Sequence, residues 1–322
     1  MPALVLEFAR LDLGQTSNSR CSTQALGKGP PRNRIKENLD IKKKKYVCLA
    51  PTHCAARLIK GSTFNSFIGG NGNRLKSLKG LEYLDYIIVD EISMMREQFY
   101  KCLLTIKKLH PNVKVIMVGD FRQLPVVNDR IKGDYSKSLA LKEICDYNQV
   151  ALSKCRRSDV RLFTVSQDVE AINKDDFGSK KTYKNNCFTN ATRRFINNEC
   201  MNRYANLKRK YTKVGSLKIS EGMPIICKQT IEKHDLINNE FFTVESVDCE
   251  KVNLKRDDGE SIEAGHAFFL QNFELAFCIT VHCSQGLSID EAYSIWEWEK
   301  FSKKMKYTAI TRARRYNDIN LI

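Results

Sequence analysis

The feature that most constrains this chain is a series of short apolar runs that alternate with segments of helical spacing between residues 46 and 150. Three of these runs are Tyr46–Ala50, Tyr86–Val89 and Lys114–Val118. Each run is bounded by charged or polar residues, which is typical of a strand that is buried on both faces. Strands that alternate with helices in this way predict an α/β fold built on a parallel sheet.

Two neighbouring carboxylates, Asp90 and Glu91, directly follow the second run. In an open α/β sheet, ligands bind at the carboxyl ends of the strands. A carboxylate at that place can hold Mg²⁺ together with phosphates, and its neighbour can activate water for attack on a phosphoryl group. Asp90 is therefore the predicted Mg²⁺ ligand and Glu91 the predicted general base. Taken alone, the pair is equally consistent with a solvated turn after a strand.

Further polar groups follow the next strands along the chain. Gln123 comes after the third run, where its amide could contact both a γ-phosphate and the attacking water. Arg156 and Arg157 follow a short strand at residues 149–152, and an arginine there can pair bidentately with phosphate. A surface salt bridge is the favoured alternative for these arginines. The hydroxyl and aromatic residues of 61–67 suit contacts with a nucleic-acid strand, and a capped helix start explains them about as well.

The charge and the cysteine content of the chain indicate what kind of partner it binds and in which redox environment it works. Its 322 residues carry a formal net charge of +16, which favours a polyanionic partner such as nucleic acid, with a lysine-rich background as the alternative. The 12 cysteines include no Cys-x-x-Cys pair, so free thiols in a reducing intracellular compartment are expected. No apolar run is long enough to span a membrane, and no secretory signal is recognisable.

The second half of the chain combines predicted helices with a region of short strands. A helix is predicted over 192–201, with Asn190 or Thr192 as its N-cap, and a strongly basic stretch follows at 204–213. That stretch is a candidate phosphate-contacting surface, although such charge runs are usually only solvated. Short strands with a hairpin turn at 257–259 predict a small antiparallel barrel over 215–271. Residues 306–315 predict a helix that carries Arg312 on a polar edge.

Six stretches, taken in order, resemble the RecD/PIF branch of superfamily 1B helicases: APTHCAARLIKGSTFNSF, IIVDEISMM, VGDFRQLPVV, LSKCRRSD, TVHCSQGLSI and YTAITRARR. The resemblance covers residues 35–322, and the wording of the motifs is similar to that of helicases from large DNA viruses. It implies two RecA-like domains, at 35–150 and 151–322, with a Src-homology-3-like barrel inserted in the second. It also implies ATP and Mg²⁺ as cofactors and an ATP-dependent DNA helicase that moves 5′-to-3′ on single-stranded DNA.

The resemblance assigns a role to each motif residue. Asp90 and Glu91 match the Mg²⁺ and water-activating positions, and Gln123 matches the γ-phosphate sensor. Arg157 matches the arginine that reaches the γ-phosphate from the second domain, with Arg156 as an alternative, and Arg312 matches the arginine finger. The loop that couples the nucleotide to the nucleic-acid strand is matched by Gln285 and Gly286. The stretches that contact the strand itself contain Thr52, His53, Thr63, Phe64, Thr280 and His282. Asn65 stands where the family commonly has His.

The N-terminal segment, residues 1–34, departs from the family. It contains no Ile and no Tyr, and its one Lys is Lys28, whereas the chain from Ile35 onward is crowded with Ile, Lys and Tyr. The family needs a phosphate loop that ends Gly-Lys-Ser/Thr just before a helix, which is predicted here to begin at Ile35. Gly29-Pro30-Pro31-Arg32-Asn33 stands in that position, Lys28 lies a few residues too early, and the two prolines lack N–H donors. A frame error, a mis-set start or a decayed gene would each produce this pattern.

Two functions are therefore consistent with the sequence. One is an ATP-driven DNA helicase, and the other is a nucleic-acid-binding protein with a helicase fold and an impaired ATPase. No residue pattern reads the 2′-hydroxyl, so RNA stays open as an alternative to DNA. No residue pattern identifies a protein partner.

Overall fold

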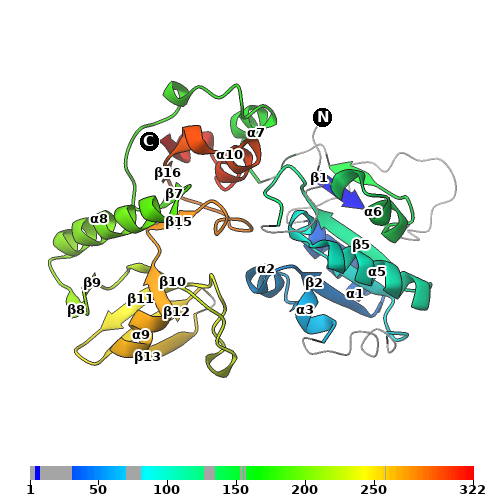
Figure 1. The fold of residues 1–322 in the computed structure, drawn as a ribbon, viewed down its shortest axis with the longest axis horizontal. Helices are drawn as coiled ribbons and strands as arrows, with labels where there is room; N and C mark the ends of the chain where they lie inside the picture. Colours follow the sequence, from blue (N-terminus) through cyan, green and yellow to red (C-terminus); the bar gives the residue numbers. More distant parts are fainter. Residues whose placement is uncertain are drawn as a thin grey trace. The chain divides into compact units, whose positions relative to one another are not determined.

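The structure, a computed structural model, describes residues 4–7, 31–69, 81–126, 135–152, 155, 157–257 and 259–322. The chain divides into two compact units, Met1–Arg157 (unit 1) and Ser158–Ile322 (unit 2) (Figure 1). Both units are α/β, as the alternation of strands and helices predicted.

Unit 1 is built on a six-stranded sheet with the order β3-β2-β4-β5-β1-β6. Neighbouring strands are parallel from β3 to β5, which confirms the predicted parallel sheet. The remaining β1 is antiparallel to both of its neighbours. The strands are β1 (Leu4–Glu7), β2 (Tyr46–Ala50), β3 (Ser62–Thr63), β4 (Tyr86–Val89), β5 (Lys114–Gly119) and β6 (Val150–Leu152).

Both faces of this sheet are covered by helices, because side chains alternate between the two faces of a strand. Ile88 of β4 and Ile116 of β5 pack in one cluster with α1 (Pro31–Ile41) and α2 (His53–Leu58). Their neighbours Ile87 and Val115 point the other way and pack with α5 (Glu97–Leu109) and α6 (Leu139–Ile144). The apolar runs are continuous because each strand needs an apolar residue on both faces.

The helix α1 begins four residues before the predicted start at Ile35. Its buried residues are Ile35 and Leu39, one turn apart, and the lysine-rich turn follows as predicted. The prediction of the start was wrong because Pro31 was treated as a breaker. At the first position of a helix the missing N–H costs nothing, and the fixed φ of proline suits the helix.

Unit 2 contains a parallel four-stranded sheet with the order β15-β7-β16-β17. Its strands are β7 (Asn185–Cys187), β15 (Cys278–Thr280), β16 (Tyr293–Ile295) and β17 (Ile319–Leu321), and its helices are α7 (Val160–Gln167), α8 (Asn190–Lys208) and α10 (Lys303–Ile310). The N-cap of α8 is Thr189, whose hydroxyl accepts from the Thr192 N–H at 3.1 Å. The prediction of Asn190 or Thr192 as the cap was wrong, because several capping residues adjoin one another there.

The strand-rich region of unit 2 forms an antiparallel five-stranded sheet with the order β13-β12-β11-β10-β14. Its elements are β10 (Pro224–Cys227), β11 (Phe241–Val247), β12 (Lys251–Arg256), β13 (Ser261–Gly265), α9 (His266–Asn272) and β14 (Phe273–Leu275). A separate hairpin, β8 (Thr212–Val214) with β9 (Leu217–Ile219), precedes it. The strands were predicted well, but in the described residues they form an open sheet and a hairpin, so the closed barrel of the prediction is not shown.

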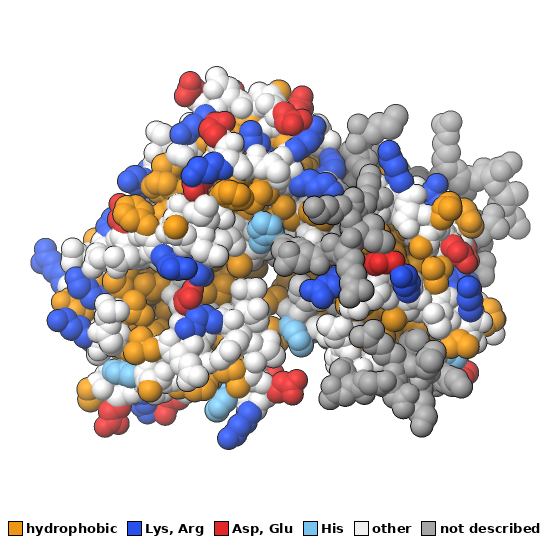
Figure 2. Space-filling view, viewed as in Figure 1, with side chains coloured by type: hydrophobic (Ala, Val, Ile, Leu, Met, Phe, Trp, Pro, Cys, Tyr) orange, Lys and Arg blue, Asp and Glu red, His pale blue; other side chains and the backbone are white. Residues whose placement is uncertain are grey.

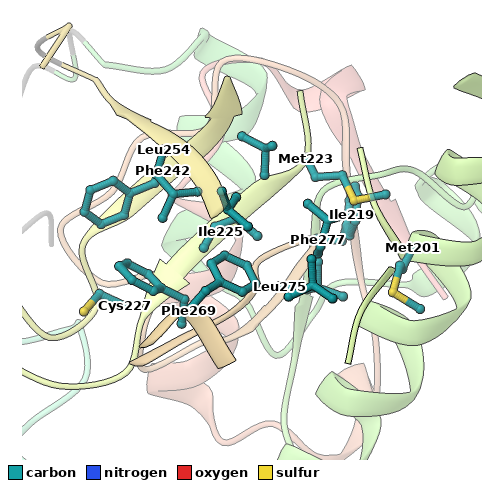
Figure 3. Close-up of a cluster of buried hydrophobic side chains, with 14 of the residues drawn as sticks. Met201, Ile219, Met223, Ile225, Cys227, Phe242, Leu254, Phe269, Leu275 and Phe277 are labelled. Carbon is teal, nitrogen blue, oxygen red and sulfur yellow. The ribbon is translucent and has the colours of Figure 1, made fainter. Parts of the chain in front are cut away.

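One hydrophobic core joins the antiparallel sheet to α8 and to the hairpin (Figure 3). Met201 of α8, Ile219 of β9, Ile225 of β10 and Phe242 of β11 belong to it, and Phe269 of α9 stacks on Phe273 at 5.7 Å between ring centroids. The antiparallel sheet is therefore fixed to unit 2 by a shared core.

Candidate nucleotide and nucleic-acid sites

Asp90 lies at the carboxyl end of β4, where it was predicted. Its N–H donates to the Leu49 carbonyl at 2.9 Å, so the ladder with β2 reaches as far as Asp90. Its side chain is 4% exposed, and Oδ1 accepts from the Glu91 N–H at 3.0 Å. A buried carboxylate at a strand end fits an Mg²⁺ that shares its coordination with waters and phosphates.

Glu91 has a left-handed backbone, with φ 54° and ψ 46°, directly before the 3-10 helix Ile92–Met94. Such a conformation costs a non-glycine residue on the order of 1–3 kcal/mol and persists only where the surroundings fix it. Gly119 at the end of β5 contributes to this, since a Cβ there would lie 2.7 Å from Ile92 Cγ1 and 2.8 Å from the Ile92 nitrogen. Strained positions of this kind concentrate at functional sites, which agrees with the predicted role of Glu91.

The loop after β5 is fixed by a pair that the sequence analysis missed, Asp120 and Arg122. Asp120 is 2% exposed, and it accepts from the Arg122 backbone N–H at 3.0 Å, from Nε at 3.1 Å and from Nη2 at 3.1 Å. The N–H of Gln123 donates to the Asp120 carbonyl at 3.0 Å. Because β4 and β5 are parallel neighbours, this turn brings Gln123 to the same sheet edge as Asp90 and Glu91.

The strand β1 has an unexpected direction for a strand that would precede a phosphate loop. β1 lies beside β5 but runs against it, with Val5 opposite Gly119 and Glu7 opposite Met117. Its carboxyl end therefore points away from the edge that carries Asp90. A phosphate loop requires a strand whose carboxyl end leads into the N-terminus of a helix at that edge. Residues 8–30, with Lys28, lie outside the described residues.

The start of α1, by contrast, lies on the side that a phosphate loop needs. The Tyr46 hydroxyl donates to Asp40 at 2.8 Å, so the last turn of α1 adjoins the first residue of β2. The first turn of α1 consequently lies toward the carboxyl edge of the sheet. Since α1 begins at Pro31, only two residues, Gly29 and Pro30, separate its start from Lys28 in the sequence.

Arg312 is placed differently from the prediction. It follows the end of α10 and is 1% exposed, so a polar helix edge was wrong for it. Its Nε donates to the Thr308 carbonyl at 2.9 Å, Nη1 to the Leu287 carbonyl at 3.1 Å and Nη2 to the Thr311 hydroxyl at 3.2 Å. The guanidinium thus ties the end of α10 to the loop that contains the predicted Gln285 and Gly286.

Gly286 has φ +83°, a value that favours glycine in this loop, and the Leu287 N–H donates to Ser284 at 3.1 Å. Arg157 is exposed, and Arg156 lies outside the described residues. The reach of Arg157 and Arg312 toward a nucleotide stays a prediction.

The residues predicted to contact nucleic acid in unit 1 fall into two groups. Thr52 and Thr63 cap helices, since their hydroxyls accept from the Ala55 N–H at 3.2 Å and the Ser66 N–H at 3.1 Å. His53 is exposed. Phe64 is fully buried and stacks on Phe99 at 4.7 Å between ring centroids, so a strand contact by its ring was wrong. An aromatic residue next to a helix cap often packs into the core, and Phe64 does so here.

In unit 2, the predicted strand contacts Thr280 and His282 follow β15. Thr280 Oγ1 donates to Cys283 Sγ at 3.3 Å, which closes a short turn, and the His282 side chain is exposed. The carboxyl ends of β15 and β7 lie at one edge, because these strands are parallel with Thr280 opposite Cys187.

Glu297 is a further residue at this edge that the sequence analysis missed. It has φ 62°, and its Oε2 accepts from the Phe188 N–H at 3.1 Å and the Thr189 N–H at 3.0 Å. Although desolvation opposes it, donation by the Thr189 N–H, Lys300 and other groups lowers the pKa of Glu297 below its ordinary value. Glu297 therefore holds the turn between β7 and α8. The only signal in the sequence was the Glu-x-x-Lys spacing to Lys300.

The described residues lack a preformed metal centre and a membrane-spanning helix. They contain no group of three His, Cys, Asp or Glu arranged as a metal centre, so Mg²⁺ at Asp90 would depend on phosphate and water ligands. Among the described helices, none combines the length and the apolar character that crossing a bilayer would require.

Parallel sheets with polar groups at one sheet edge, as in unit 1, are typical of RecA-like nucleotide hydrolases. Residues 27–129 match the AAA domain family. The ATP-dependent DNA helicase Pif1 of Bdellovibrio bacteriovorus is 23% identical over 358 residues, covering 88% of this chain and 79% of that protein.

Two solved Pif1 structures are similar to this chain in fold. Bacteroides Pif1 bound to single-stranded DNA has a TM-score of 0.63 at 18% identity, covering 90% of this chain and 85% of that one. Pif1 helicase from Candida albicans has a TM-score of 0.63 at 19% identity, covering 90% and 87%. These likenesses show the fold. Together with the sequence matches they bear out the resemblance to superfamily 1B helicases that was drawn from the motifs.

Proposed function

We propose that this chain is an ATP-dependent DNA helicase that moves 5′-to-3′ on single-stranded DNA. The observation that carries the proposal is the sheet edge of unit 1, where the buried Asp90, the strained Glu91 and the fixed turn of Gln123 meet. Three such groups at the ends of adjacent parallel strands are the arrangement that nucleotide hydrolysis needs.

In the proposed mechanism, Asp90 holds Mg²⁺, which would neutralise the charge that develops on the phosphates. Glu91 accepts a proton from the attacking water, and Gln123 contacts the γ-phosphate and that water. Arg157 and Arg312 would stabilise the transferring phosphoryl group. Arg312 must first release its bonds to Thr308 and Leu287, of which the bond to Leu287 holds the Gln285–Gly286 loop.

In the same proposal, unit 1 contacts the strand through the exposed His53 with Thr52 and Thr63, and unit 2 contacts it through the exposed His282 with Thr280. RNA is the alternative strand. The eleven described cysteines form no disulfide, which supports the proposal of a reducing intracellular compartment.

A second function is favoured by one observation, the antiparallel direction of β1. A chain whose strand does not lead into α1 at the nucleotide edge would lack the main hold on the β- and γ-phosphates. It would then bind nucleic acid with a helicase fold and hydrolyse ATP poorly.

The deciding experiment is steady-state ATP hydrolysis by the full chain, with and without single-stranded DNA. Strong stimulation by the strand supports the motor, and no turnover with intact strand binding supports the second function. Glu91→Gln is expected to lower turnover by at least about a hundredfold while strand binding is kept. Glu97→Gln is a matched control, because Glu97 is a nearby carboxylate paired with Lys101 on α5. Loss of strand binding and turnover together in Glu91→Gln would contradict the assigned role.

A further inference from the structure

Unit 2 carries a basic surface that the proposed sites do not use. It consists of Arg203 and Lys208 of α8, Arg209 and Lys210 after it, Lys213 of β8 and Lys218 of β9, here called the hairpin surface. Lysine and arginine side chains gather at the left edge of Figure 2, over the C-terminal end of α8 and the hairpin. Residues 203–218 contain these six cations and no Asp or Glu.

Elsewhere in unit 2, several basic side chains have acidic partners. Arg193 pairs with Glu274, and Lys251 pairs with Glu263. Within the described part of the chain, no ion pair joins any of the six cations of the hairpin surface to a carboxylate. The positive field at this surface is therefore not neutralised by the protein itself.

The two lysines of the hairpin repel each other in the folded state. Lys213 of β8 lies directly opposite Lys218 of β9 in the antiparallel register. Like charges at such cross-strand positions are destabilising. Cations in the last turn of α8 can offset the helix dipole, which would explain Lys208 and Arg209, but not a lysine pair on the hairpin beyond the helix.

Two tyrosines hold lysines of this surface in place. The Lys208 ammonium lies 5.6 Å from the ring centroid of Tyr204, and the Lys218 ammonium lies 5.6 Å from that of Tyr211. Because an ammonium group occupies one face of each ring, that face is not available to stack on an unpaired base, although Tyr211 is 43% exposed. The surface presents charge rather than stacking platforms, which suits a backbone of regularly spaced phosphates.

The hairpin surface is also distant from the predicted strand path. α8 begins at the carboxyl edge of the sheet and has 19 residues, so its far end lies about 28 Å from that edge. A nucleic acid at the hairpin surface therefore occupies a second site.

We propose that the hairpin surface binds the phosphate backbone of duplex DNA without sequence preference. The inference rests on the proposed function, since a helicase substrate has a duplex part beside its single strand. Duplex DNA has a higher charge density than a single strand, and neutralising its phosphates releases counterions.

The test uses the full chain and a variant with Arg209, Lys210, Lys213 and Lys218 replaced by Gln. Binding to a blunt duplex and to a single strand of equal length is measured over a series of salt concentrations. We expect the duplex affinity to fall at least about tenfold, and the slope of log affinity against log salt to fall by about 3–4. Single-strand affinity and strand-stimulated ATP turnover stay unchanged. Lys251→Gln with Lys255→Gln is the control, with two lysines removed from β12.

The single variant Lys213→Glu sharpens the test and guards against misfolding. It replaces a repulsive cross-strand pair by an attractive one, so the melting temperature should rise while duplex affinity falls. Equal losses for duplex and single strand would overturn the proposal in favour of a strand-binding surface. No loss for either, in a folded variant, would leave only a solvated surface. Failure of the motor is distinguishable, because it would appear as absent ATP turnover in the unaltered chain.

Discussion

Glu297 offers a prediction that can be worked out from the structure. Replacement by Ala removes the carboxylate that accepts from the Phe188 and Thr189 N–H groups. Hydrogen bonds to a charged group contribute about 1.5–3 kcal/mol each when buried. These donors are partly exposed, so we expect a total loss of about 2 kcal/mol, and the exposed pair with Lys300 adds little.

Two further variants divide this loss into its causes. Glu297→Gly loses the same bonds but relieves the left-handed backbone at φ 62°, so it should be about 1 kcal/mol more stable than Glu297→Ala. Glu299→Gln is the matched control, because Glu299 is exposed and lies in the same 3-10 helix. It should change the free energy of unfolding by less than about 0.5 kcal/mol.

The pH dependence gives an independent check. Because the folded pKa of Glu297 is lowered, its stabilisation is complete above the unfolded value of 4.5 and is lost as the pH falls through the folded pKa. The assay is urea unfolding of the full chain and of Glu297→Gln at about pH 7 and at about pH 4. The difference between the two proteins should shrink at the lower pH. A difference independent of pH, or Glu297→Gly as unstable as Glu297→Ala, would refute the reasoning.

Three further predictions concern unit 1 and the Arg312 linkage. Phe64→Ala should destabilise the chain by about 3–5 kcal/mol in urea unfolding, and Phe64→Leu, which keeps most of the apolar volume, should leave strand affinity near normal, since the ring lies in the core. Gly119→Ala should cost about 1–3 kcal/mol and lower ATP turnover more than strand binding, because its Cβ would press on the Glu91–Ile92 turn. Arg312→Lys, with one donor group in place of a planar fork, should uncouple turnover from strand binding and raise protease sensitivity around Gly286.

Much of the fold followed from periodicity, and the misses have specific causes. The strands β2, β4 and β5 were predicted nearly to the residue because apolar side chains on both faces leave a continuous run. Thr189, Phe64 and Arg312 were misplaced because a cap, a core contact and a buried guanidinium depend on neighbours that are distant in the sequence. Phe64 meets Phe99, and Arg312 meets Leu287. Local pattern carries no information about such pairs.

The antiparallel sheet illustrates a second limit. Its strands alternate clearly, so their existence and order could be predicted, but closure into a barrel depends on whether the edge strands β13 and β14 meet. The residue pattern within a strand does not indicate whether its edge pairs with another edge strand. The core shared with α8 was equally invisible, because Met201 and Phe242 come together only after the hairpin has folded back.

The N-terminal segment brings two observations into conflict, and the conflict is informative. The start of α1 at Pro31 and the AAA domain match from residue 27 place Lys28 closer to a phosphate-loop position than the sequence analysis allowed. The direction of β1 argues against such a position, since the strand runs from the edge that carries Asp90 toward the opposite edge of the sheet. A helix with its first turn at the correct edge supplies N–H groups and a favourable dipole for phosphate, whichever strand precedes it. In a phosphate loop, the preceding strand brings the loop to this edge of the sheet. The antiparallel direction of β1 therefore affects phosphate binding more than it affects the catalytic groups at Asp90 and Glu91. We therefore predict weak nucleotide affinity together with intact catalytic groups at Asp90 and Glu91.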